Sequence, residues 1–290
     1  MADYRNHPRI VPARPDIAAA HLEGQVDAER FVDPVDMQTT AGVTSIRRAP
    51  QDDAEMDQQL LFGEVFAALE ERDGWAWGYS RHDGYVGYVD MAALSQPVDA
   101  VTHRVSALRT YLFSEPDLKS APHCLLSMNA KIASGEKQGR FIRAGHHGWV
   151  FEGHLVPLDH AAPDFVAIAE RFEGAPYLWG GKESLGLDCS GLVQTSLEAA
   201  GIRVFRDSAV QEGEFAERWT NMGVEAPRQR GDIVFWKGHV GIMVSETDLI
   251  HANATFMETK IEPVAETERR AVASGLPATS VVRLTDYEPA

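Results

Sequence analysis

Strand-length runs of apolar and aromatic residues, separated by turn residues, fill the chain between about Gln58 and Ala93. The runs are QQLLFGEVFAALEE, DGWAWGYS and HDGYVGYVD. Asp73-Gly74 and Asp83-Gly84 stand between them, and these two residue types tolerate the positive φ that tight hairpin turns require. The pattern predicts a small β barrel.

A second cycle of short strands follows and ends like the first. GYVGYVDMAAL at 84–94 closes one cycle and HGWVFEGHLVPL at 147–158 closes the other, which indicates a tandem repeat of about 60 residues. The two cycles resemble bacterial SH3-like modules over residues 36–157. A spacer barrel that binds no ligand is the alternative interpretation of this region.

The remaining segments predict one short arm and one α+β unit. The first 35 residues carry four prolines around a short helical stretch, 16–28. After Pro157, helical spacing predicts a helix over 164–172, and a second one runs from Asp188 to a stop at Gly201. Val- and Ile-rich runs then predict strands at 232–237, 239–244, 249–253 and 281–284. The expected domains are therefore an arm (1–35), two SH3-like β barrels (36–98 and 99–157) and an α+β domain (158–290).

Composition excludes several classes of protein. The 290 residues are 44% hydrophobic and 24% charged, as in a folded chain, and the net charge of -16 has the wrong sign for binding nucleic acid or anionic membranes. Two cysteines make no disulfide framework. Neither a signal peptide nor an apolar run of membrane-spanning length is visible, so a cytoplasmic protein is expected.

Cys189 has the setting of a nucleophile. It follows a glycine-broken loop at the predicted start of a helix, where unpaired N–H groups favour a thiolate and lower the thiol pKa. Asp188 opposes this effect, so it must have another duty: capping the helix, or binding a substrate ammonium. Cys124, in PHCLLSM, is interpreted as a small buried hydrophobe.

Two histidines complete the candidate site. His239 and His251 lie on neighbouring predicted strands, and if they share a face they form a triad in which His239 takes the proton of Cys189 and His251 orients His239. Whether they share a face depends on the register of the turn. A buried structural cysteine and a zinc site are the alternatives, but the spacing offers no chelating pair and no fourth ligand. No metal or cofactor is expected.

Five ordered segments carry a specific resemblance. They are APYLWGG (175–181), DCSGLV (188–193), RGDIVFW (230–236), HVGI (239–242) and LIHA (249–252). In this order they resemble the NlpC-type family of bacterial cell-wall cysteine peptidases. The resemblance implies a reduced papain-like fold, a catalytic triad of Cys189, His239 and His251, and Tyr177 beside the thiol.

The resemblance also implies a substrate. Such peptidases hydrolyse the γ-D-glutamyl to diamino-acid bond of peptidoglycan stem peptides, and those with two SH3-like modules often require a free N-terminal L-Ala. Asp188 and Ser190 would then bind that alanine, with Glu64 and Tyr85 contributed by the first barrel. For Glu64 the alternative is a solvated acid at a strand edge.

Three functions follow from these observations. The first is a cytoplasmic peptidase that releases L-Ala-γ-D-Glu from murein stem peptides during recycling. The second is an exported endopeptidase or amidase that acts on intact peptidoglycan. The third is a wall-binding scaffold in which the papain-like unit is inactive, and the complete triad argues against it. The identity of the third stem residue, lysine or diaminopimelate, and the oligomeric state stay open.

Overall fold

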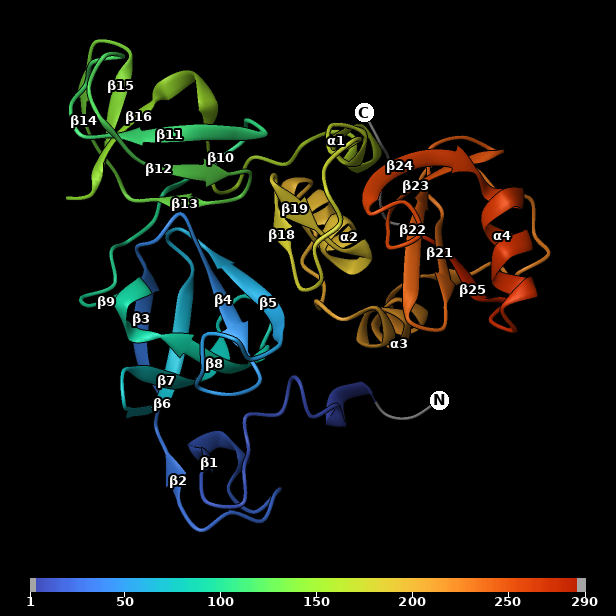
Figure 1. Ribbon diagram of the computed structural model, residues 1–290, viewed down its shortest axis with the longest axis horizontal. Coiled ribbons are helices and arrows are strands. Elements are labelled where there is room, and N and C mark those ends of the chain that lie inside the picture. The colour runs from blue at the N-terminus through green and yellow to red at the C-terminus, as the bar shows by residue number, and fades with distance from the viewer. Residues whose placement is uncertain (1–3, 286–290) are drawn as a thin grey trace. The chain divides into compact units, whose positions relative to one another are not determined.

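The computed structural model describes residues 4–285 and divides into two compact units. One unit spans Arg5–Asp159, and the other contains His160 onward together with the first residues of the chain. Figure 1 shows the first in blue to green and the second in yellow to red. Residues 1–3 of the expected arm and 286–290 of the expected α+β domain lie outside the described range.

The first unit contains a seven-stranded antiparallel sheet in the order β5-β4-β8-β7-β6-β3-β9. Asp73 and Gly74 have φ of 51° and 83°, and Arg72 pairs with Trp75, so the predicted two-residue hairpin turn is confirmed. The strands are β3 (Val35–Thr39), β4 (Val43–Arg47), β5 (Met56–Leu61), β6 (Val65–Arg72), β7 (Trp75–Ser80), β8 (Val86–Asp90) and β9 (Leu94–Ser95), with a 3-10 turn at Met91–Ala93.

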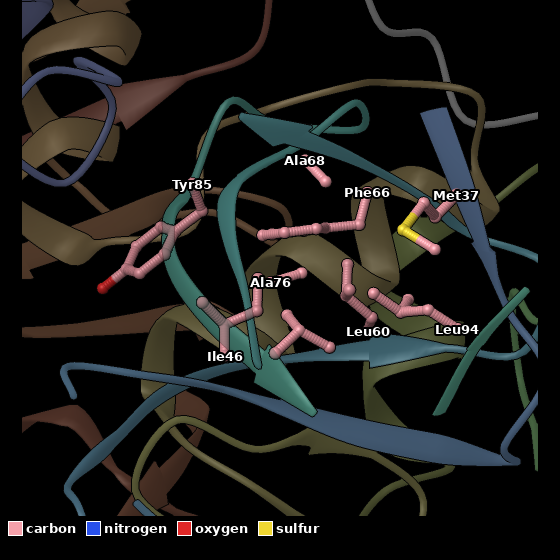
Figure 2. Packing of buried hydrophobic residues seen from close by; sticks show 9 residues of the cluster. Met37, Ile46, Leu60, Phe66, Ala68, Ala76, Tyr85 and Leu94 are labelled. Atoms are coloured by element: carbon pink, nitrogen blue, oxygen red, sulfur yellow. The ribbon is translucent and has the colours of Figure 1, made fainter. Parts of the chain in front are cut away.

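The expectation of a closed barrel is wrong for this sheet. Its two end strands, β5 and β9, each pair with one neighbour, and no pairing within residues 4–285 joins them. Closure needs a full row of backbone donors and acceptors at both edges. Strand β9 supplies only Leu94 and Ser95, and both pair with β3. The sheet still encloses a core in which Phe66, Leu60 and Met37 pack together, with Tyr85 at one end and its hydroxyl directed away (Figure 2).

The rest of this unit forms two further sheets within residues 4–285, so the expectation of a second barrel over 99–157 is also wrong. A five-stranded sheet has the order β12-β11-β16-β15-β14, and a three-stranded sheet has the order β13-β10-β17. Cys124 lies on β12, packs beside the apolar cluster of this region, and has its thiol pKa raised by burial, as expected of a small hydrophobe. The strands are β10 (His103–Val105), β11 (Arg109–Phe113), β12 (Pro122–Ser127), β13 (Lys131–Ile132), β14 (Ser134–Gln138), β15 (Phe141–Ala144), β16 (Gly148–Phe151) and β17 (Leu155–Pro157), with a 3-10 turn at Glu152–His154.

The N-terminal arm contains no α-helix over 16–28, so that prediction is wrong. Strand β1 (Ala18–Ala19) pairs in parallel with β2 (Phe31–Val32), and a single 3-10 turn, Ala20–Leu22, lies between them. Gly24 has φ of 77°, which ends any helical continuation. Ile17 is fully buried in a cluster with Trp77 and Tyr79, and this burial fixes the arm as extended chain.

The second unit is a six-stranded antiparallel sheet with helices packed on it. The order is β20-β25-β21-β22-β23-β24. The predicted strands and both predicted helices of this unit are confirmed, with ends shifted by a few residues. The elements are α1 (Phe165–Glu170), β18 (Lys182–Glu183), β19 (Gly186–Leu187), α2 (Cys189–Ala199), α3 (Ser208–Arg218), β20 (Thr220–Asn221), β21 (Ile233–Trp236), β22 (His239–Met243), β23 (Asp248–Asn253), β24 (Glu258–Pro263), α4 (Val264–Ala273) and β25 (Ala278–Arg283).

Helices cover both faces of this sheet. Phe215 of α3 packs edge-on against Phe235, with ring centroids 5.4 Å apart, whereas Val264 of α4 packs in a cluster with Val234. Val234 and Phe235 are neighbours on β21 and therefore point to opposite faces. Helix α2 packs on β22 and β23, which brings its first residue to the strands that carry the histidines. Within residues 4–285, no helix has the length and apolarity to cross a membrane.

Candidate active site

Cys189 is the first residue of α2, as the sequence predicts. The Asp188 carboxylate caps the helix by accepting the N–H of Gly191 at 2.8 Å, and Gly201, with φ of 80°, follows its end. The first N–H groups of a helix have no partner inside it, and that of Cys189 is one of them. The sulfur is thus held close to a backbone donor that can stabilise an oxyanion.

His239 and His251 share one face of the sheet. Strand β22 pairs with β23 so that Ile242 lies opposite Ile250, and this register places Gly241 opposite His251. His239 is two residues from Gly241 and therefore points the same way. The rings meet with His239 Nε2 2.8 Å from His251 Nδ1. The sequence left open whether the two histidines share a face, and the register of β22 and β23 shows that they do.

A carboxylate extends this chain of histidines. Glu262 on β24 places Oε1 2.9 Å from His251 Nε2. Because a carboxylate only accepts hydrogen bonds, His251 carries its proton on Nε2 and accepts from His239 Nε2–H through Nδ1. The remaining nitrogen of His239, Nδ1, is then the unprotonated one. Both nitrogens of His251 are used within the protein, which leaves it no lone pair for the zinc site considered from the sequence.

Glu262 is itself held in its ionised form. Burial opposes its ionisation, but hydrogen bonds from the Arg270 guanidinium and from Thr267 Oγ1, at 2.8 Å, outweigh burial and lower the pKa of the carboxyl. Sequence reasoning missed Glu262 because it is one of several acids in ETKIEPVAE and belongs to no motif. Its only signal is its pairing opposite Leu249, two residues from His251, which requires the strand register.

The pKa of the Cys189 thiol is raised, whereas the sequence predicts that it is lowered. Burial raises the pKa of Cys189 well above its ordinary value, and the neighbouring Asp188 charge adds to this. N–H groups of Val240 and Ser190 and the Arg206 charge oppose the increase without reversing it. Burial also lowers the pKa of His239 and of His251. The resting site therefore holds a neutral thiol and neutral imidazoles.

Asp188 lies at the centre of a second polar network. Its carboxylate accepts the N–H of Gly180 at 2.8 Å and a bidentate pair from Arg206 at 2.8 and 2.7 Å, in addition to the capping bond. Arg206 also donates to Ser190 Oγ at 2.7 Å. These contacts match the capping duty left open by the sequence. The role of Asp188 and Ser190 in binding an ammonium stays a prediction.

The thiol and His239 line a cavity of about 370 Å³, which Tyr177 also borders. Tyr177 is half-buried there, and burial together with the neighbouring Cys189 raises the pKa of its hydroxyl. Two cations border the cavity, Lys237 and Arg270. None of the described residues that line it is an aspartate or a glutamate. The cleft is thus cationic in a chain whose net charge is -16.

Glu64 and Tyr85 lie in the other compact unit. Glu64 is 1% exposed, accepts the N–H of Leu61 at 2.9 Å and lies 3.5 Å from Lys131 Nζ, so the alternative of a solvated edge acid is wrong. Tyr85 is buried in the core that Figure 2 shows. Their role as substrate contacts stays a prediction.

Comparison with protein families decides the identity of the second unit. A model of the NlpC/P60 family matches residues 174–272, which contain Cys189, both histidines and Glu262. Residues 174–272 form an NlpC/P60 domain. A second model, of the bacterial dipeptidyl-peptidase SH3 domain, matches residues 46–94. The resemblance drawn from the sequence is confirmed, and the NlpC/P60 domain makes the chain a peptidase of the cysteine type.

Two curated relatives match most of the chain. Dipeptidyl-peptidase 6 of Lysinibacillus sphaericus is 24% identical over 78% of this chain and 90% of its own. The gamma-D-glutamyl-L-lysine dipeptidyl-peptidase of Bacillus subtilis is 26% identical over 72% of this chain and 76% of its own. Both alignments are long enough to extend beyond the NlpC/P60 domain.

A solved structure shares the fold. An NlpC/P60 family protein from Bacillus cereus has a TM-score of 0.72, covers 86% of this chain and 99% of its own, and is 17% identical. At that identity the likeness concerns the fold. It agrees with a sheet-rich N-terminal region followed by an NlpC/P60 domain.

Proposed function

We propose that the chain is a cysteine peptidase that hydrolyses the γ-D-glutamyl to diamino-acid bond of peptidoglycan stem peptides with a free N-terminal L-Ala. The observation that carries this proposal is the chain of contacts from His239 through His251 to Glu262, which lies beside Cys189 and borders a cationic cleft. Such a site can attack an amide carbonyl and protonate its leaving amine.

Acylation begins from the neutral site. As Cys189 Sγ attacks the γ-carbonyl carbon, its proton moves to His239 Nδ1, so no free thiolate needs to exist in the buried resting state. The Cys189 N–H donates to the oxyanion. His239 then returns the proton to the leaving amine as the C–N bond breaks and a thioester remains. The Glu262 charge stabilises the transient imidazolium through His251.

Deacylation reverses these roles. A water molecule gives a proton to His239 and adds to the thioester carbon, and the C–S bond then breaks as Cys189 regains a proton. The products are L-Ala-γ-D-Glu and a free diamino acid. Each proton that His239 takes up is returned within the same half-reaction.

The charge of the cleft supports a γ-linked substrate. A γ-glutamyl linkage leaves the α-carboxylate of D-Glu free, close to the scissile carbonyl. Of the two lining cations, Arg270 is committed to Glu262, whereas Lys237 forms no ion pair among residues 4–285. Lys237 is the cation that we assign to a substrate carboxylate.

The requirement for a free N-terminus rests on relatives. The family model over residues 46–94 describes a dipeptidyl-peptidase SH3 domain, and both long-matching relatives are named dipeptidyl-peptidases. We keep Asp188 and Ser190 as the residues of the NlpC/P60 domain that would bind the L-Ala end, and the part of Glu64 and Tyr85 in substrate binding stays a prediction. We further propose that soluble peptides released during wall recycling are the substrate, because a net charge of -16 repels anionic wall polymers.

Mass spectrometry of products tests the proposal. The full chain is incubated with L-Ala-γ-D-Glu-diaminopimelate, its lysine counterpart and the N-acetylated form of each. We expect the free peptides to yield L-Ala-γ-D-Glu and the blocked ones to remain intact, with no turnover by Cys189→Ala. Equal cleavage of blocked peptides would contradict the dipeptidyl-peptidase activity, and release of peptides from intact sacculi would favour the endopeptidase alternative.

A further inference from the structure

Three side chains capable of binding a metal meet in the first unit, outside every element used above. His146 and His147 form the turn between β15 and β16, and Asp99 lies in the segment between β9 and β10. One ligand atom from each lies within 4.8 Å of the other two. All three residues belong to the same compact unit.

The distances between the Asp99 carboxylate and the two imidazoles suit binding to one shared ion better than direct hydrogen bonds between these groups. Asp99 Oδ2 is 3.7 Å from His146 Nδ1 and also 3.7 Å from His147 Nε2. Both separations are too long for a hydrogen bond to an imidazole. Metal–ligand bonds of about 2.0–2.1 Å at a tetrahedral ion place donor atoms roughly 3.4 Å apart, which is close to both carboxylate–imidazole separations.

The chain fixes this arrangement from several sides. Gln38 holds Asp99 by accepting its backbone N–H at 2.8 Å, and Phe62 packs edge-on against the His147 ring at 5.2 Å. Gly145 has φ of 54°, and a Cβ there would lie 2.6 Å from Asp99 Oδ2. A side chain at position 145 would therefore displace the carboxylate from the two imidazoles.

We propose that Asp99, His146 and His147 bind a divalent transition-metal ion, with Zn²⁺ as the preferred occupant. Two imidazoles and one carboxylate are a ligand set that suits zinc. The His146 side chain is 69% exposed, so solvent reaches the site and water completes the coordination. Bound metal ties the segment between β9 and β10 to the β15–β16 turn, and has no role in peptide cleavage.

Calorimetric titration of Zn²⁺ into tag-free, full-length protein tests this site. Cys189→Ala is the background, because it removes the catalytic thiol as a competing ligand. We expect one ion per chain, and an affinity that falls about 100-fold or more in His146→Ala, His147→Ala and Asp99→Asn. His21→Ala, which removes another exposed histidine of the same unit, is the matched control and should bind zinc unchanged.

Thermal unfolding gives a second measurement. Zinc that binds only the folded chain raises the melting temperature of the background protein, and this increase should vanish in Asp99→Asn. His146 is exposed, so His146→Ala keeps the proposal testable if the other variants fold poorly. Unchanged zinc affinity in His146→Ala and Asp99→Asn, or binding that disappears only with His239→Ala, would overturn the proposal.

Discussion

Two buried polar networks flank Cys189. One contains two neutral imidazoles, and the other contains an ion pair between a carboxylate and a guanidinium. In the network of His239, His251 and Glu262, burial lowers the pKa of both imidazoles, so they rest neutral with a lone pair on His239 Nδ1. In the network of Asp188 and Arg206, both groups are charged and the carboxylate accepts four N–H hydrogen bonds.

This difference suits the histidine network to proton transfer and the Asp188–Arg206 network to holding the backbone around Cys189 in place. A proton can move only through groups that can change their charge, and the histidine network keeps such groups beside the thiol. The carboxylate of Asp188 accepts N–H groups of Gly180, Gly191 and Arg206, so it fixes the helix start and the loop before it.

Breaking the charged network should cost stability. Arg206→Met leaves the buried Asp188 carboxylate without its counter-ion, and we expect a loss of about 3–5 kcal/mol in the free energy of unfolding. Urea unfolding measures it. Arg269→Met is the control, because its pair with Glu266 is exposed and screened by solvent and should contribute little to stability. Equal losses in the two variants would mean that the Asp188 network does not depend on its charges.

Neutralising Glu262 should slow catalysis without disrupting the fold. Glu262→Gln removes the negative charge that favours an imidazolium, and we expect kcat to fall about 100-fold with little change in KM. Because that charge raises the pKa of both histidines, the acidic limb of the pH profile should move to lower pH. Glu262→Asp should keep the wild-type limb, and Glu258→Gln on the same strand is the control. A purely structural Glu262 would leave the limb in place.

The neutral histidines should make the fold sensitive to acid. Burial lowers their pKa from 6.5 to about 3 for His239 and about 4 for His251. Between pH 6.5 and 4 the unfolded chain binds protons that the folded chain does not, so the free energy of unfolding falls as pH falls, by at most about 1.4 kcal/mol per pH unit for each histidine. The double variant His239→Asn, His251→Asn should show a shallower slope, and an unchanged slope would contradict the assignment.

Lys237 belongs to neither network and should have the smallest effect. Lys237→Gln removes an exposed cation from the cleft, and we expect KM for the tripeptide to rise about fivefold with kcat nearly unchanged, equivalent to roughly 1 kcal/mol. Lys260→Gln, a half-buried lysine of the same unit that does not line the cavity, is the control. If both variants behave alike, Lys237 does not meet a substrate carboxylate.

Sequence patterns predicted the second unit better than the first. Asp188 as a cap and Gly201 after the last turn predict helix α2, and Val-rich runs predict the strands of the sheet. In the first unit the strands were expected but their closure was wrong, because closure depends on the pairing of β5 and β9, which no local pattern encodes. The helix predicted in the arm is wrong because Ile17 is buried against Trp77 and Tyr79, and contacts with such distant residues cannot be read from the arm's own sequence.

The site shows the same division. Cys189, His239 and His251 stand in motifs, so their residue types and spacing predict that they belong to one site. Glu262 depends on the β23–β24 register, and the partnership of Asp188 with Arg206 joins residues that share no motif. The predicted fall in the thiol pKa was wrong because burial, which outweighs the helix start, is a property of the packed fold.

Trapping the acyl-enzyme shows directly whether Cys189 is the nucleophile. The full chain is mixed with excess L-Ala-γ-D-Glu-diamino acid, quenched in acid during turnover, digested and analysed by mass spectrometry. We expect an L-Ala-γ-D-Glu adduct on the peptide that contains Cys189, and none on the peptide that contains Cys124. Product formation by Cys189→Ala at the wild-type rate would contradict this role of Cys189.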